Sequence, residues 1–227
     1  MMLVATVVGS GIMAQSLTSD MALELLCNAL ATGAVLVVLI TILAPISGAR
    51  LNPVVTLIAA IQRELSPREA VAYVATQVGG AVIGTLIAHA MFGLSPIVLS
   101  THVRTGPSLW LSEFVATFGL ITVVGLGPRE NRGAVPWLIG LYIVAAYWFT
   151  SSTSFANPAV TIARALTDSF AGIRPIDVPG FIAAQIAGAL FGLAVAEIVS
   201  PRRNAAADSR LLQTPGERPT RSYASVD

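Results

Sequence analysis

Charged side chains are scarce in this sequence, and lysine is absent altogether. Of the 227 residues, 11% are charged, and all 13 basic residues are arginine. Soluble globular proteins carry about 25% charged residues, so the composition excludes an ordinary soluble domain. The single cysteine, Cys27, permits no intrachain disulfide bond. The arginines form no cluster within a folded soluble segment, so we expect no nucleic-acid partner.

Long apolar stretches dominate the chain instead. Hydrophobic residues make up 55% of it, and the mean hydropathy is +0.77. Apolar segments of about 18 residues or more can cross the roughly 30 Å hydrocarbon core of a bilayer. The sequence therefore predicts an all-α protein embedded in membrane lipid. We expect six transmembrane helices at residues 1–15, 22–45, 67–92, 108–127, 134–150 and 179–200.

A short motif occurs twice inside this apolar sequence, and we call each copy an Asn-Pro box. Asn-Pro-Val-Val-Thr at 52–56 matches Asn-Pro-Ala-Val-Thr at 157–161. Asparagine is a favoured N-cap, and proline fits the first helical position because its missing N–H loses no partner there. Each box therefore predicts the start of a re-entrant half-helix, at residues 53–63 and 158–167. The defining residues are Asn52, Pro53, Val54, Asn157, Pro158 and Ala159.

The two halves of the chain repeat each other around these boxes. Residues 77–84 align with residues 185–192, with glutamine first and glycine last in both segments. Because each half contributes three spans, an odd number, the second half must enter the membrane upside down relative to the first. We therefore predict a first inverted repeat at residues 1–103 and a second at residues 104–200.

The two ends of the chain carry separate expectations. Aligning the repeats places the counterpart of Glu113 before Met1, so we expect the first span to be truncated at its N-terminus. Residues 201–227 are too poor in large apolar groups to order themselves, which predicts a disordered cytoplasmic tail. All but three arginines fall on the side of the membrane that carries both termini. The positive-inside rule then predicts a multi-pass protein of the cell's inner (plasma) membrane with cytoplasmic termini.

The paired half-helices predict a pore for uncharged molecules. Two helix N-termini that meet mid-membrane direct two positive dipole ends at one point, which repels cations. The asparagine amides offer hydrogen-bond donors to a passing solute, and the loop carbonyls before each box offer acceptors. Irregular backbone at membrane depth must line a cavity or be buried in protein. These features indicate passive passage of small neutral, hydroxylated solutes.

The paired boxes, six spans and inverted repeat over residues 1–200 resemble the aquaporin (major intrinsic protein) family. The resemblance implies the aquaporin fold, a channel rather than an enzyme, no cofactor or bound metal, and a homotetramer whose subunits each enclose a pore. In the first box, Val54 departs from the usual alanine. In this family a glutamate at the position of Glu113 accepts hydrogen bonds from the re-entrant loop, so we expect a structural, buried acid there; proton coupling is the alternative.

The same resemblance implies a selectivity filter, located by spacing from the boxes. Its four positions are Thr32, Ala145, Ser154 and Val160. Water-selective members, and most glycerol-conducting ones, have arginine at the position of Val160, so we expect a wider constriction without its fixed cation. Arg164, one helical turn further on, either lines the outer vestibule or packs in an ion pair with Asp168.

The second box and the residues after it resemble a bacterial aquaporin subgroup associated with arsenic resistance. This resemblance implies that metalloid hydroxides such as arsenite, as neutral As(OH)₃, pass together with glycerol and water. A water and glycerol channel without a metalloid role is one alternative, and an inverted-repeat secondary transporter is another. An ion channel is a third, because the filter arginine is missing. The sequence contains no nucleophile or metal-ligand constellation that indicates an enzyme.

Overall fold

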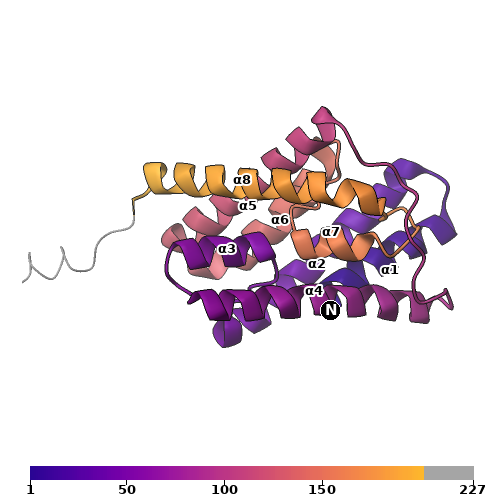
Figure 1. Ribbon diagram of the computed structural model, residues 1–227, viewed down its shortest axis with the longest axis horizontal. Helices are drawn as coiled ribbons and strands as arrows, with labels where there is room; N and C mark the ends of the chain where they lie inside the picture. The colour runs from indigo at the N-terminus through magenta and orange to yellow at the C-terminus, as the bar shows by residue number, and fades with distance from the viewer. Residues whose placement is uncertain (202–227) are drawn as a thin grey trace, which may run out of the picture.

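The computed structural model describes residues 1–201, and within that range all regular secondary structure is helical (Figure 1). Its α-helices are α1 (Met2–Leu17), α2 (Met21–Ser47), α3 (Pro53–Ile61), α4 (Pro67–Met91), α5 (Pro107–Glu130), α6 (Val135–Phe149), α7 (Pro158–Arg164) and α8 (Val178–Val199). Short 3-10 turns, η1 (Arg132–Ala134) and η2 (Pro175–Asp177), precede α6 and α8. The predicted tail at 201–227 lies outside the described residues except for Pro201.

Five helical segments are long and apolar enough to cross a membrane. They comprise α2, α4, α5, α6 with η1, and α8 with η2, whereas α1 is a shorter apolar helix of 16 residues. Large apolar side chains such as Ile46, Val71 and Ile198 are 70–79% exposed on the outside of the bundle. This outward apolar surface is what a lipid environment requires.

Local sequence signals set the helix boundaries. The Asp20 side chain accepts hydrogen bonds from the backbone N–H groups of Ala22 and Leu23 at the start of α2. Ser66 and Glu69 form a capping box at the start of α4. At the other end of α2, Gly48 takes a left-handed φ of 69°, which glycine adopts without steric cost.

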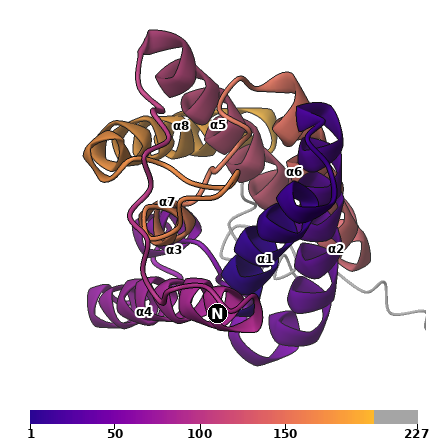
Figure 2. The same ribbon diagram turned by 90° about the vertical axis from the view of Figure 1, so that its right-hand side faces the viewer.

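The two half-helices α3 and α7 lie end to end through the middle of the bundle. Figure 1 shows them between α4 on one side and α8 on the other, and Figure 2 looks along them with α7 in front of α3. Both begin at the proline of an Asn-Pro box, and their N-termini meet. They therefore run in opposite directions, as the predicted inverted repeat requires.

The packing of the helices follows the same twofold relation. The contact of α1 with α4 is matched by that of α5 with α8, and α1 with α2 is matched by α5 with α6. Contacts of α4 with α7 and of α3 with α8 cross between the halves. The predicted six-span, two-half-helix architecture of the aquaporin fold is thereby confirmed. The boundary between residues 103 and 104 stays a prediction, since the two halves share one core.

Glycine permits the tightest of these contacts. A Cβ atom at Gly192 would lie 2.6 Å from the carbonyl oxygen of Phe118, and one at Gly188 would collide with the carbonyl of Phe114. Helices α5 and α8 therefore approach backbone to backbone, as small residues four apart allow in membranes.

Both half-helices are shorter than predicted. Helix α3 ends at Ile61 rather than residue 63, because Arg63 adopts a left-handed φ of 60°. Helix α7 ends at Arg164 rather than residue 167. There the carbonyls of Ala165 and Leu166 accept hydrogen bonds from Ser100 and Val98 of the α4–α5 connection, so tertiary partners replace a further helical turn.

Candidate functional site

The two Asn-Pro boxes are joined by reciprocal hydrogen bonds. The amide of Asn52 donates to the carbonyl of Ala156 at 2.7 Å, and the amide of Asn157 donates to the carbonyl of Leu51 at 3.0 Å. Each asparagine thus binds the residue that precedes the other asparagine. An asparagine amide has two N–H groups, so each retains a second donor for another partner.

The asparagine oxygens cap the half-helices. The oxygen of Asn52 accepts from the backbone N–H of Val54 at 3.0 Å. The oxygen of Asn157 accepts from Ala159 at 3.0 Å and from Val160 at 3.3 Å. The capping interaction fixes each side chain with its amide N–H groups directed away from its own helix.

A cavity of about 560 Å³ passes these boxes inside the single chain. Asn52 and Asn157 line it, and so do Thr32, Ser154 and Val160. The other box residues, Pro53, Val54, Pro158 and Ala159, are buried but are not part of the lining. A second cavity of about 1080 Å³ adjoins the first near Gly48 and Val55.

Charge along the first cavity is confined to its two ends. Among the lining residues of the described chain, the charged ones are Arg132 and Arg164. Between them lie the asparagine amides, hydroxyl groups and apolar side chains. The arrangement suits a neutral solute with polar and apolar surface, because a low-dielectric passage without carboxylates offers little to a cation.

Ala145, the predicted filter residue on α6, does not line the cavity. Ala145 is exposed on the outside of α6, whereas Ile143 and Tyr147 line the cavity. Residues two apart on an α-helix point roughly 200° away from each other, so Ala145 and Tyr147 face opposite sides. The prediction rests on spacing from the second box, and the connection at residues 150–156, between α6 and that box, contains three residues at positive φ.

Tyr147 lines the cavity next to α2. Its hydroxyl lies 3.2 Å from the hydroxyl of Thr32 across the helix interface, and both side chains are buried. Of the residues at or near the predicted filter positions, Thr32, Tyr147, Ser154 and Val160 line the cavity. This set contains one large aromatic ring where the sequence argument expected a small side chain.

Glu113 of α5 anchors the loop that carries the second box. Its carboxylate accepts from the backbone N–H groups of Phe155 and Ala156, both at 2.9 Å, and from the amide of Gln185 at 2.7 Å. Its exposed fraction is 0%. This loop holds Thr153, Ser154 and Ala156 at positive φ, a conformation that costs about 1–2 kcal/mol per residue and needs such an anchor.

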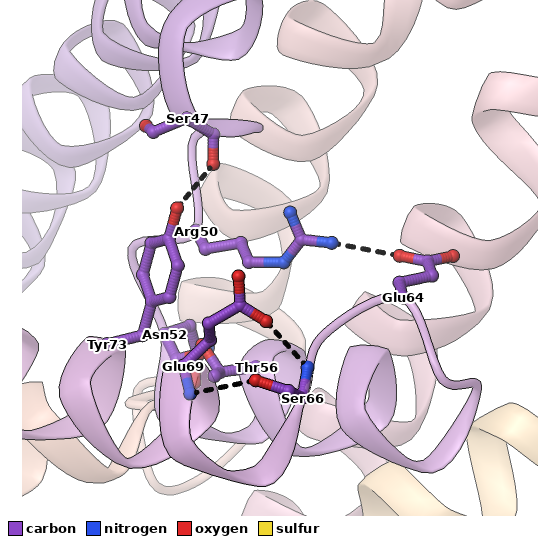
Figure 3. A network of polar contacts seen from close by, with 8 residues as sticks. All are labelled: Ser47, Arg50, Asn52, Thr56, Glu64, Ser66, Glu69 and Tyr73. Carbon is purple, nitrogen blue, oxygen red and sulfur yellow. Dashed lines mark hydrogen bonds and ion pairs between the residues drawn. The ribbon is translucent and has the colours of Figure 1, made fainter.

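The loop before the first box is held differently. Gln77 of α4 donates to the carbonyl of Arg50 at 2.7 Å and to the hydroxyl of Thr56 at 2.8 Å. The guanidinium of Arg50 reaches Glu64 at 2.9 Å near the surface, and Tyr73 donates to the carbonyl of Ser47 (Figure 3). Gln185 makes the matching contact to Thr161 at 2.9 Å in the second half.

Arg104, in the α4–α5 connection, joins the second loop to the segment that follows α7. Its three guanidinium nitrogens donate to the carbonyls of Gly172, Ser152 and Phe170 at 2.7–3.2 Å. Burial lowers the pKa of Arg104, and the negative charge of Glu113 raises it. The side chain remains a cation committed to backbone carbonyls.

Arg164 is fully buried at the end of α7, and it lines the cavity. Its Nε donates to the carbonyl of Ala171, and its guanidinium carbon lies 3.4 Å from the ring centroid of Phe155. The alternative in which Arg164 pairs with Asp168 is wrong. Asp168 accepts instead from the N–H of Thr101 at 2.8 Å, a bond that holds its pKa below the usual value.

Sequence reasoning missed several residues that build this site. Gln77 and Gln185 were recognised as matching positions, but their contacts to the loops were not predicted. A polar side chain in an apolar span is costly unless it has a hydrogen-bond partner, so the position of each glutamine within a span indicates a buried partner. Tyr147 and Arg104 had no signal of this kind, because only the folded loops define what they touch.

Three comparisons place this geometry among known proteins. The profile of the major intrinsic protein family matches residues 1–154. The "Aquaglyceroporin AqpS" of Rhizobium meliloti is 59% identical over 194 residues, covering 86% of this chain and 83% of the relative. "Aquaporin NIP2-1" of Zea mays is 34% identical over 152 residues, covering 63% of this chain and 50% of the relative.

A solved structure agrees with the fold. The aquaglyceroporin of Plasmodium falciparum superposes with a TM-score of 0.61 at 16% identity, covering 88% of this chain and 93% of that chain. That identity supports the fold alone, whereas the family profile and the bacterial relative cover most of the sequence. The chain belongs to the major intrinsic protein family of membrane channels.

Proposed function

We propose that the protein is a passive channel for small neutral hydroxylated solutes. Metalloid hydroxides such as As(OH)₃ are the proposed principal substrates, with glycerol and water as co-substrates. The observation that carries this proposal is the pair of crossed asparagines, each lining the cavity with an amide N–H to spare. They offer donors in mid-passage where no carboxylate competes.

The filter supports a solute larger than water. By the resemblance, Val160 stands where water-selective members and most glycerol-conducting ones have arginine, and its side chain is apolar. Together with the ring of Tyr147 it presents apolar surface to the carbon side of a polyol. Ser154 and the asparagine amides face the same cavity, so the hydroxyl side of the solute finds hydrogen-bond partners.

The metalloid substrate rests on the resemblance to arsenic-resistance aquaporins and on chemistry. As(OH)₃ is uncharged near pH 7, and it carries three hydroxyl groups, as glycerol does. A passage that accepts one by size and hydrogen bonding accepts the other. The relative named as an aquaglyceroporin supports glycerol and water as further substrates.

We also propose a place and an assembly for the channel. Apolar side chains cover the outside of the described helices, which supports a multi-pass membrane protein. The inner membrane with both termini cytoplasmic follows from the arginine distribution. A homotetramer is proposed from the resemblance to the family, with each chain enclosing its own cavity; the mass of the detergent-solubilised protein tests it.

Flux into proteoliposomes tests the proposal. Stopped-flow scattering follows water and glycerol, and arsenic content follows As(OH)₃, with empty vesicles as the control. We expect all three solutes to enter faster than in empty vesicles, with rates linear in concentration. Entry of As(OH)₃ at the empty-vesicle rate contradicts the metalloid substrate. Saturation with counterflow would instead identify a transporter.

A further inference from the structure

Arg164 has hydrogen-bonding capacity that the protein does not use. Its exposed fraction is 0%, and Nε donates to the carbonyl of Ala171. Neither Nη1 nor Nη2 has a hydrogen-bond partner among residues 1–201. A buried cation with unmatched donors is costly, and in a cavity lining that cost is relieved by whatever occupies the cavity.

The direction of α7 places the guanidinium of Arg164 closer to the turn of Val160 than its position in the sequence suggests. Side chains on an α-helix lean toward its N-terminus and cover the preceding turn. The N-terminus of α7 is the second Asn-Pro box, so the side chain of Arg164 extends toward the turn that carries Val160. The cation absent from position 160 thus approaches the same level of the cavity from one turn further along α7.

Arg104 provides the contrast. Both arginines lie against the ring of Phe155, with guanidinium carbons 5.1 Å and 3.4 Å from its centroid for Arg104 and Arg164. Arg104 uses all three nitrogens on backbone carbonyls and does not line the cavity. Arg104 therefore holds the loops through their carbonyls, whereas two nitrogens of Arg164 are available to bind a ligand.

A second unmatched group lies in the same lining. The hydroxyl of Ser154 is buried, and it too has no hydrogen-bond partner among the described residues. Ser154 precedes Phe155, the ring on which Arg164 rests, and it lines the same cavity. The lining of one cavity thus includes two unmatched guanidinium nitrogens of Arg164 and one unmatched hydroxyl of Ser154, which both donates and accepts.

We propose that Arg164 and Ser154 form a solute-binding subsite that replaces the missing filter arginine. The two Nη groups donate to two oxygens of a hydroxylated solute, and the Ser154 hydroxyl exchanges a hydrogen bond with a third. Arg164 is therefore a specificity-determining residue for solutes with three hydroxyl groups. This proposal rests on the proposed channel function and names the residues that select its substrate.

The test is the ratio of glycerol to water permeability in proteoliposomes, which cancels differences in the amount of folded channel. For Arg164→Gln we expect the ratio to fall about tenfold, because hydrogen bonds from a charged donor are lost. Arg164→Lys keeps the charge without the planar fork and should give an intermediate ratio. Ser154→Ala should lower the ratio about threefold, consistent with one neutral hydrogen bond.

Arg174→Ala is the matched control, since Arg174 pairs with Asp177 at 3.0 Å and does not line the cavity. Its ratio should stay within twofold of the wild type. A ratio within twofold of the wild type for Arg164→Gln overturns the subsite. If that variant does not fold, an unchanged ratio for Ser154→Ala overturns it instead. Failure of As(OH)₃ entry in the wild type contradicts only the metalloid substrate, because the glycerol ratio is measured independently.

Discussion

The two re-entrant loops have the same motif but are held by different chemistry. In the second loop, Ser152, Ser154 and Phe155 are buried, and a carboxylate binds two backbone N–H groups. In the first loop, Arg50 is partly exposed, and its side chain makes a surface ion pair with Glu64. The second loop holds three non-glycine residues at positive φ, Thr153, Ser154 and Ala156, whereas the first holds one, Ala49. The loop with more backbone strain is thus the one held by a buried carboxylate.

Removing the buried carboxylate should have the largest effect. Glu113→Gln presents an N–H to the loop in place of one oxygen, and each hydrogen bond to a charged group is worth about 1.5–3 kcal/mol. We expect the free energy of unfolding to fall by about 3 kcal/mol or more, with loss of glycerol flux. Thermal unfolding in detergent measures the first effect and vesicle flux the second.

The counterpart in the first half is Gln77→Ala. It removes two neutral hydrogen bonds, to the carbonyl of Arg50 and to Thr56, which are worth about 1 kcal/mol each. We expect a smaller loss of stability, with residual flux. A Gln77 variant less stable than the Glu113 variant would reverse the ranking of the two loops.

An arginine introduced at matching positions of the two boxes should reduce solute flux by different amounts, because only one of the two positions lies in the predicted filter. Val160→Arg places a second guanidinium beside Arg164 in the constriction, and we expect glycerol and As(OH)₃ fluxes to fall at least about tenfold while water flux persists. Val55→Arg alters the level where the two cavities adjoin, so its effect should be smaller. Equal losses in both variants would place the constriction elsewhere.

The α6 position of the filter has its own test. Tyr147→Ala removes the ring and the contact to Thr32, so the glycerol-to-water ratio should change by several-fold. Ala145→Phe adds a ring on the exposed side of α6 and should leave the ratio unchanged. A change confined to the Ala145 variant would restore the position expected from spacing.

The smallest expected effect concerns the segment after α7. Asp168 accepts hydrogen bonds from the backbone N–H and hydroxyl of Thr101, which hold its pKa below the usual value. Its stabilising contribution is therefore complete above the unfolded pKa of about 4 and is lost as pH falls through the folded pKa. The melting temperature of the wild type should approach that of Asp168→Asn below about pH 4. A constant difference between them at all pH values would contradict this linkage.

The sequence predicts the scaffold well because its signals are local. Span length, N-cap asparagine and helix-start proline each act within a few residues, so both boxes fall where expected. The filter depends on the path of residues 150–156, in which three residues adopt positive φ. No local pattern specifies that path, and the spacing from the second box predicts Ala145, which does not line the cavity. The expected ion pair between Arg164 and Asp168 fails for a similar reason. Thr101, which is distant in sequence, donates a hydrogen bond to the Asp168 carboxylate instead.

The crossed asparagine bonds have a consequence for biosynthesis. When a ribosome has inserted only the first half, the amide of Asn52 and the carbonyl of Leu51 are polar groups at membrane depth without their final partners. Those partners emerge 104 and 106 residues later in the chain. Unmatched backbone groups are poorly tolerated in lipid. The hydrogen bonds at the midpoint of the passage therefore cannot form until residues 156 and 157 of the second half have been made and have met the first box.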